Sequence, residues 1–223
     1  MKLPVFDTNG KELRQIDVAD EVFGIEPNRS VLHQAYVAQM ANRRVGGANT
    51  LNRGDVEGST VKIRKQKGLG RSRQGSIRAS HHVGGGVAHG PHPHSFAKAM
   101  PRTMKRLALR SALSDHAASG TMFVVEGLVP AEPRTKTVQA TLDANGVVRR
   151  VLIVSGEFEK NLTAAARNID IAKAVPAANL NVVDLVNAHR VVMTEDAVRR
   201  AEALWGGANI KPARGRRPEA ANA

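Results

Sequence analysis

Hydrophobic positions follow regular spacings at both ends of the chain and lose them in the middle. The segments KLPVF (2–6) and ELRQI (12–16) flank DTNGK, in which Asn9-Gly10 is typical of a tight hairpin turn. Apolar residues from Val31 to Met40 then recur at helical spacing, with Asn28 as a candidate N-cap. We expect this helix to run into Arg43 and Arg44, so that residues 1–45 are folded.

The next helical pattern covers PRTMKRLALRSALSDHAAS, residues 101–119. Proline suits the start of a helix, and Gly120 suits its end. Met104 and Ala112 belong to one apolar side, but Leu109 and Leu113 lie outside it. This distribution predicts a helix that is partly covered on both sides.

Short apolar runs alternate with amphipathic stretches after residue 120. Strands are predicted at 121–127, 149–156 and 189–194, helices at 135–146, 159–169 and 194–206, and either a short strand or a helix at 180–188. Unbroken apolar strands between such helices indicate a mainly parallel sheet covered on both faces. The predicted fold class is therefore α/β, formed discontinuously by residues 1–45 and 100–206, and the remainder, 207–223, has the composition of a disordered tail.

Residues 46–99 show no sustained periodicity and are rich in Gly, Ser, His, Pro, Lys and Arg. The only candidate strand is STVKIR, residues 59–64. Because ordinary loops in compact domains are shorter than about 15 residues, a stretch of this length indicates a functional excursion. We expect a long extended loop whose two ends are held by one folded domain.

The positive charge of the chain is concentrated around this loop. The chain has 33 Lys and Arg against 20 Asp and Glu, a net charge of +13. Residues 43–106 alone hold 14 Lys and Arg against Asp55 and Glu57, a net charge of +12. Such a segment attracts a polyanion, either nucleic acid or an anionic membrane surface. No apolar run is long enough for a membrane span or a signal peptide, so we expect a cytoplasmic protein and no membrane partner.

The stretch from 62 to 78 is the candidate RNA-binding core of the loop, because it has seven Lys and Arg, no acid and three glycines. Its cations could neutralise phosphates, while glycine allows the backbone to approach a ribose-phosphate wall. The loop contains Phe96 as its only aromatic residue, which disfavours modules that stack bases on aromatic rings and favours recognition of structured RNA by shape and charge. The competing interpretation is a disordered basic linker.

The sequence contains no recognisable catalytic or cofactor site. GLGRSRQG holds a Gly-x-Gly, but it lacks the strand-to-helix setting and the Gly-Lys-Ser/Thr ending of phosphate-binding loops. Ser155-Gly156 lacks the framing of a nucleophile elbow, and the acids are isolated or stand at helix ends. Five of the eight histidines lie in residues 81–94, a composition that suits a metal site, an RNA contact or a plain loop. Because no carboxylate or thiol lies nearby, we predict that this stretch binds no metal. Together with the missing motifs, this predicts no cofactor and no enzyme activity.

Several motifs together resemble the bacterial large-subunit ribosomal protein four family, in order and over about residues 1–205. They are KGLGRSRQGSIR (67–78), GGGVAHGPHPHSF (84–96), RLALRSALS (106–114), VLIVSGE (151–157), NLTAAARN (161–168) and VVMTEDAV (191–198). The resemblance implies a three-layer α/β/α domain, 23S rRNA and neighbouring large-subunit proteins as partners, and a loop that helps line the nascent-peptide exit tunnel. It also places Lys67 and Gly70 in the region where changes in family members are associated with macrolide resistance. Relatives typically carry basic or aromatic residues near the positions of His81, His82, His92 and His94, so local RNA contacts here are expected to be weaker or dependent on pH.

The predicted function is that of a structural constituent of the 50S subunit that binds 23S rRNA. The alternative is a regulatory protein acting on its own messenger RNA leader or on a transcription complex, as some family members do. We expect the loop to become ordered on binding RNA. The predicted RNA-binding residues are Arg43, Arg44, Arg53, Lys62, Arg64, Lys65, Lys67, Gly68, Gly70, Arg71, Arg73, Arg78, His81, His82, Lys98, Arg102, Lys105 and Arg106.

Overall fold

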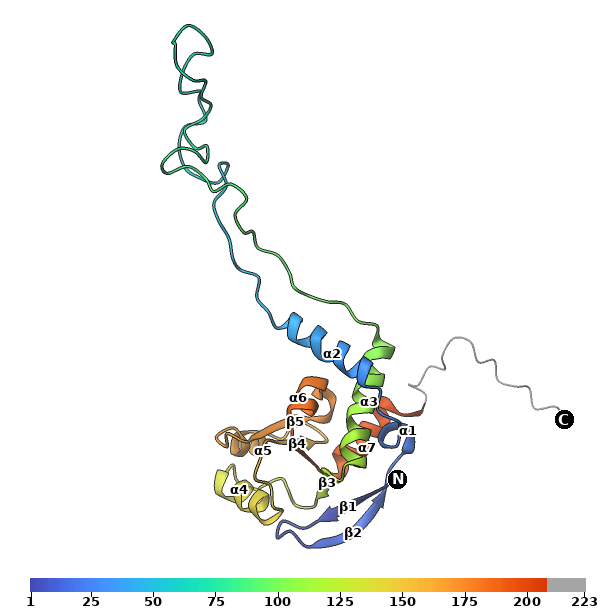
Figure 1. Cartoon of the computed structure of the whole chain (residues 1–223). Coiled ribbons are helices and arrows are strands. Elements are labelled where there is room, and N and C mark those ends of the chain that lie inside the picture. The colour runs from blue at the N-terminus through green and yellow to red at the C-terminus, as the bar shows by residue number, and fades with distance from the viewer. Residues whose placement is uncertain (208–223) are drawn as a thin grey trace, which may run out of the picture. The chain divides into compact units, whose positions relative to one another are not determined.

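A computed structural model describes residues 1–207 of the chain (Figure 1). The expected tail, apart from Gly207, lies outside the described residues. The chain divides into two units. One, the α/β unit, combines Met1–Met40 with the chain from Ala99 onward, and the other, which we call the arm, is Ala41–Lys98.

A six-stranded sheet forms the centre of the α/β unit. Its strands, in the spatial order β2-β1-β3-β6-β4-β5, are β2 (Glu12–Asp17), β1 (Lys2–Phe6), β3 (Met122–Val125), β6 (Arg190–Met193), β4 (Val151–Ser155) and β5 (Ala172–Pro176). Only β1 and β2 pair antiparallel, while the remaining neighbours are parallel. The prediction of a mainly parallel sheet is confirmed.

Helices cover both faces of this sheet. One face is packed by α1 (Asp20–Phe23), α3 (Arg102–Ala118), α6 (Val182–Asn187) and α7 (Glu195–Trp205), and the other by α4 (Thr135–Ala144) and α5 (Lys160–Ala166). Helix α2 (Arg29–Asn42) packs in turn against α3, and a 3-10 turn, η1, spans Ala177–Asn179. The arrangement is the expected three-layer α/β/α domain (Figure 1).

The inner strands β3 and β4 are almost entirely apolar because both of their faces are buried. In β4, Leu152 and Val154 join the cluster beneath α3 and α7, whereas Val151 and Ile153 join the cluster beneath α4 and α5. Successive side chains of a strand point to opposite faces, so a strand between two helical layers needs apolar residues at every position.

Helix α3 is buried on two sides, as its sequence predicts. Leu113 packs into the cluster on the sheet, while Ala108 packs with Ala35 of α2 and Val182 of α6. Two buried serines add polar connections. Ser114 Oγ accepts from the amide of Ile25 (3.1 Å), and Ser111 Oγ accepts from that of Asn28 (3.3 Å), so α3 is tied to the segment that joins α1 and α2.

Several local predictions need correction. Sequence STVKIR is not a strand; its one backbone link across the arm is Ile63 N–H to Gly75 O (3.1 Å). Helix α2 ends at Asn42, short of Arg43 and Arg44, although its predicted cap is confirmed by the bond from the Val31 amide to Asn28 Oδ1 (3.1 Å).

The sequence pattern misses β5 and leaves α6 undecided. Strand β5 contains Lys173 and Pro176, both unusual inside a sheet, and it is tolerated because β5 lies at the sheet edge and pairs only with β4. The 180–188 segment is helical, since Asn181 Oδ1 accepts from the Asp184 amide (2.8 Å) and caps α6.

Gly10 illustrates how the hairpin fits the rest of the unit. Its amide donates to Asp7 O (3.0 Å), and its backbone adopts φ +79°. A Cβ at this position would lie 2.3 Å from Ala144 O at the end of α4, well inside contact distance. Glycine is therefore required here by both backbone conformation and space.

We predict that Gly10→Ala destabilises the α/β unit more than Gly146→Ala does. Gly146 also has a positive φ, +65°, but a Cβ there would meet nothing closer than 3.9 Å. The control variant therefore incurs only the backbone cost of about 1–2 kcal/mol, and Gly10→Ala adds a collision with backbone. Denaturant unfolding of both variants measures the difference; equal losses would contradict the packing of the hairpin on α4.

Candidate nucleic-acid interface

The arm has no hydrophobic core of its own. Among residues 41–98 only Gly86 is buried. Large apolar side chains remain in solvent, including Val45 (88% exposed), Val61 (72%) and Val83 (105%). A segment that buries so little apolar surface gains little hydrophobic stabilisation from its own contacts.

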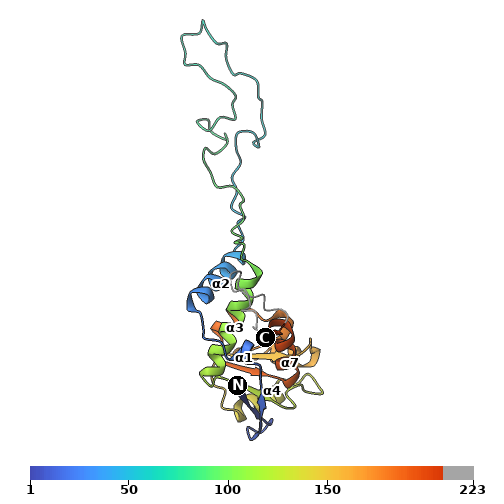
Figure 2. The ribbon, with the colours of Figure 1, turned by 90° about the vertical axis from the view of Figure 1, so that its right-hand side faces the viewer.

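Two limbs of the arm run antiparallel and are joined by sparse hydrogen bonds (Figure 2). We call residues 41–63 the outgoing limb, 64–74 the tip and 75–98 the return limb. Asn42 and Lys98 close the base, because the Lys98 amide donates to Asn42 Oδ1 (2.6 Å). Further along, the Thr50 amide donates to Pro91 O (3.0 Å) and the Val87 amide to Leu51 O (2.8 Å).

Glycines stand where the limbs approach most closely. A Cβ on Gly46 would lie 1.9 Å from His94 O, one on Gly86 would lie 2.2 Å from Arg53 N, and one on Gly90 would lie 2.0 Å from Thr50 Oγ1. Any side chain at these positions would push the limbs apart. These three glycines thus have a structural role inside the arm.

The tip differs from the limbs in what surrounds its glycines. Gly68 (φ +85°) and Gly70 (φ +57°) have left-handed backbone conformations, and a Cβ on either would meet no atom within 4 Å. The neighbouring Lys67, Arg71 and Arg73 are exposed. The tip therefore presents cations and open backbone together, which is the combination that a closely approaching phosphate chain requires.

Arg78 and Arg44 are engaged inside the arm. Arg78 Nε donates to Gly58 O (2.8 Å) and its Nη1 donates to Gly54 O (3.2 Å), so this guanidinium links the two limbs. Arg44 lies over the Phe96 ring, 4.0 Å from its centroid. Lys62 Nζ donates to Gln66 Oε1 within the chain that leads to the tip.

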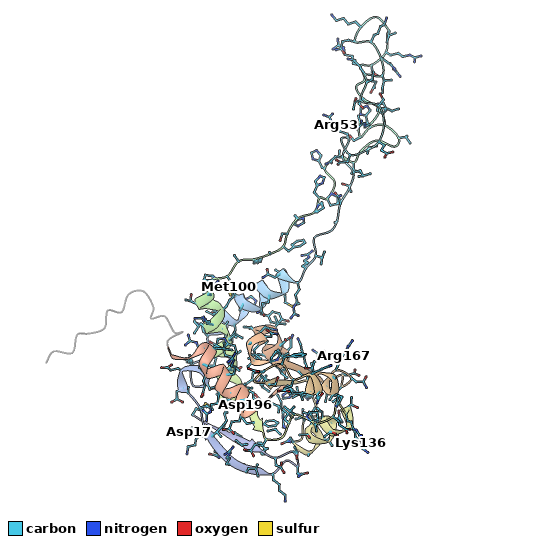
Figure 3. All side chains as sticks on the ribbon, turned by 180° about the vertical axis from the view of Figure 1, so that it is seen from behind. Asp17, Arg53, Met100, Lys136, Arg167 and Asp196 are labelled. Atoms are coloured by element: carbon cyan, nitrogen blue, oxygen red, sulfur yellow. The ribbon has the colours of Figure 1, made fainter. Side chains whose placement is uncertain are left out.

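The predicted RNA-binding residues fall on both units. Within the arm, eleven Lys and Arg stand against two acids, a net charge of +9 (Figure 3, where Arg53 is labelled). Most predicted residues are exposed, but four are half-buried: Arg64, Arg78, His82 and Arg106. Arg102, Lys105 and Arg106 lie in the first two turns of α3 and so belong to the α/β unit.

The histidine-rich stretch forms local contacts. The rings of His81 and His82 lie 4.2 Å apart between centroids, and His81 Nε2 lies 2.9 Å from Gln74 Oε1. His82 Nε2 is buried and has no hydrogen-bond partner within residues 1–207. The His94 ring packs on Phe96 at 4.4 Å. Across that same part of the chain, no group of three His, Asp or Glu side chains could hold a metal ion.

The carboxyl ends of the parallel strands, where many α/β enzymes bind ligands, border a second cleft. It has a volume of about 540 Å³, lies beside Ser155, and is lined by three acids, Glu157, Glu159 and Asp196, and two arginines, Arg199 and Arg200. The Ser155 hydroxyl is engaged, since it donates to Glu157 O (2.6 Å). The acids outnumber the arginines, so the charge of this cleft does not favour a nucleotide phosphate.

Sequence reasoning identified the cations but missed the residues that shape the arm. Asn42 and Lys98 close its base, and Gly46, Gly86 and Gly90 let its limbs touch. The sequence signal for these contacts is the high density of glycine in the segment. From the sequence alone, these glycines are interpreted as positions where the backbone can approach RNA. In the structure that interpretation fits the open positions at the tip, whereas Gly46, Gly86 and Gly90 serve contacts within the chain.

None of the helices in residues 1–207 has the length and apolar character needed to cross a bilayer.

Comparison with known proteins adds independent evidence. The model of the Ribosomal protein L4/L1 family matches residues 16–204. A large ribosomal subunit protein uL4 from Brevibacillus brevis is 44% identical over 201 residues, covering 90% of this chain and 97% of that protein. Proteins of the same name from Dehalococcoides mccartyi and Lactobacillus johnsonii are 41% and 42% identical, covering 92% and 90% of this chain and 98% and 97% of their own lengths.

These matches span both units and agree with the resemblance seen in the motifs. The family model extends across most of the α/β unit and the whole arm. Identity above 40% over nine-tenths of the chain leaves no doubt about common descent. The chain belongs to the Ribosomal protein L4/L1 family.

Proposed function

We propose that this protein is a structural component of the large ribosomal subunit that binds 23S rRNA through its arm. The observation that carries the proposal is an arm with a net charge of +9 and a single buried residue. Such a segment lacks a core of its own, and its charge suits a polyanion. The name of its relatives, large ribosomal subunit protein uL4, indicates which polyanion this is.

The α/β unit acts as the folded platform in this proposal. Its sheet is covered on both faces by helices, and the cleft at its strand ends is lined by three acids and two arginines. The protein therefore acts by binding and shaping RNA rather than by catalysis, with rRNA and neighbouring large-subunit proteins as its partners and the ribosome as its location. The base of the arm and the start of α3 contribute further cations, among them Lys98 and Arg102.

The tip is the part of the arm that we assign to the wall of the nascent-peptide exit tunnel. This assignment follows from the family resemblance of the motif from Lys67 to Arg78. It is supported by the lack of acids in the tip and by Gly68 and Gly70, at which no atom of the chain lies within 4 Å of a Cβ position.

Replacing Arg71 and Arg73 by alanine tests the phosphate contacts. We predict a lower affinity of the full-length protein for 23S rRNA, and a salt dependence whose slope, log K against log salt, falls by about 2, because two counterion-releasing contacts are lost. Filter binding or fluorescence titration over a salt series gives both quantities.

The matched control for this experiment is Arg167→Ala with Arg200→Ala, which removes the same charge from exposed positions of the α/β unit. If both double variants behaved alike, the effect would come from overall charge and not from the tip.

Crosslinking in cells tests the alternative function. If the protein crosslinked mainly to messenger RNA, with little rRNA, it would act as a regulatory protein on its messenger RNA leader instead.

The glycine contacts of the arm give a second prediction. Gly86→Ala places a Cβ 2.2 Å from Arg53 N, so it should separate the limbs and break the bond from Val87 to Leu51. We expect trypsin to cut the free variant faster than the wild type after Arg53 and Arg78, because proteolysis follows the population of the open form. Gly75→Ala is the control, since a Cβ there meets nothing within 4 Å. Equal cleavage rates would mean that the limbs are already apart without RNA.

The tunnel assignment can be tested on translating ribosomes that contain this protein. A stalled nascent chain with a photoreactive residue should crosslink to the tip, on the tryptic peptide 68–71, when that residue is held at a matching depth. Moving the residue along the nascent chain provides the control, because the adduct should appear over a limited range of positions. If no position gave an adduct on the tip while other tunnel components were labelled, the assignment would be wrong.

A further inference from the structure

A groove in the α/β unit is lined only by residues of that unit and has no place in the function proposed so far. It has a volume of about 580 Å³, within the range of ligand-binding clefts, and lies between α2, α3 and the segment that joins α6 to β6. From α2 it is lined by Arg29, Leu32, His33 and Tyr36, which recur on one face of the helix.

The opposite wall is made of small and polar residues. Helix α3 contributes Ala112 and Asp115, and the segment after α6 contributes Ala188 and His189. Ala112, Ala188, Leu32 and Val186 make part of the lining apolar, and two of these side chains are small. A flat, partly apolar group fits such a space better than a bulky one.

Two hydrogen-bonded side chains fix the walls in place. His116 Nδ1 lies 2.8 Å from Thr121 Oγ1, and its Nε2 lies 3.0 Å from Leu185 O, which connects α3 to α6. On the other side, Gln39 Oε1 accepts from the Val183 amide (3.1 Å), which connects α2 to α6. Two of the helices that border the groove are therefore tied to α6 by hydrogen bonds.

Polar groups around the groove are available for a ligand. Within residues 1–207, the side chains of Arg29, His33, Tyr36 and Asp115 take part in no hydrogen bond or ion pair. Together they offer a cation, two rings that can stack, and a carboxylate that accepts hydrogen bonds. This is the set of groups that proteins use to hold an unstacked base.

The charge beside the groove is positive. Asp115 is its only acidic lining residue. Arg29 lines the groove itself. At the His189 end, the amide of His189 donates to Arg150 O (2.8 Å). The exposed pair Arg149 and Arg150 therefore adjoins that end. An acidic or purely apolar peptide would leave either Asp115 or these arginines without a complement, whereas a nucleotide complements both.

We propose that this groove binds an unpaired nucleotide of the RNA that the protein recognises. The base stacks on Tyr36 and His33, Asp115 accepts a hydrogen bond from a base amino or imino group, and the flanking phosphates lie near Arg29 and Arg150. This inference depends on the proposed function, since it requires RNA binding, but it assigns the α/β unit a contact of a different kind. The arm supplies charge, and the groove supplies stacking.

The first experiment measures binding of full-length Tyr36→Ala to 23S rRNA over a salt series. We expect affinity to fall about tenfold, as for other lost stacking contacts, with an unchanged salt slope because no charge is removed. Tyr36→Phe keeps the ring and should bind like the wild type. Gln34→Ala, an exposed change elsewhere on α2, is the control for effects on the helix.

The second experiment does not depend on how well a variant folds. Ultraviolet crosslinking of the wild-type protein to 23S rRNA, followed by trypsin and mass spectrometry, should yield a nucleotide adduct on His33 or Tyr36 within the peptide 30–43. Residues 151–155 of the peptide 151–160, which form the buried strand β4, should carry none.

The outcomes separate this inference from the proposed function. If wild-type protein binds rRNA, the Arg71 and Arg73 variant weakens it, and Tyr36→Ala binds normally without an adduct on 30–43, the groove proposal alone is overturned. A crosslink from 30–43 to a neighbouring large-subunit protein, with no nucleotide adduct, would overturn it in favour of a protein-docking groove. If the wild-type protein fails to bind rRNA, both proposals are wrong.

Discussion

The packing of α2 against α3 is the contact on which the organisation of this protein depends. The arm is an insertion between these two helices, so its two ends continue from one and lead into the other. Ala35 of α2 and Ala108 of α3 are both buried, and they form one cluster with Val182 of α6. Ser111 and Ser114 of α3 also accept hydrogen bonds from the segment before α2. The two helices therefore connect the sheet to both ends of the arm, and they also line the groove.

Much of the α/β unit could be predicted from local sequence, for reasons visible in its strands. β3, β4 and β6 are buried on both faces and have no polar interruptions, so their composition alone marks them. β5 was not predicted because an edge strand tolerates Lys173 and Pro176, which interrupt the apolar pattern. The short helix α1 was not predicted because four residues are too few to show a helical period. The order of the strands was not readable, since β6 enters between β3 and β4 through contacts distant in sequence.

For the arm, the sequence predicts the overall composition but not the internal contacts. Its charge, its length and its single aromatic residue, Phe96, are plain in the sequence, because these properties need no knowledge of neighbouring residues. Its internal contacts are not, because a glycine at a limb contact and a glycine at an open turn look identical in the sequence. Gly86 and Gly68 have opposite surroundings, and only the path of the chain distinguishes them. The same holds for Arg78, whose charge indicated a phosphate contact but whose guanidinium holds two carbonyls of the arm.

The strand order has a consequence for how this chain acquires its structure during synthesis. β6, near the end of the sequence, lies between β3 and β4, so the sheet is incomplete until almost the whole polypeptide has emerged. Pairing across such sequence distances is slow compared with local helix formation. The arm is synthesised well before that point. It therefore leaves the ribosome while the sheet is still incomplete. A newly made molecule therefore has its strongest attraction for nucleic acid before it has its stable fold, and it needs protection from premature, nonspecific association during that interval.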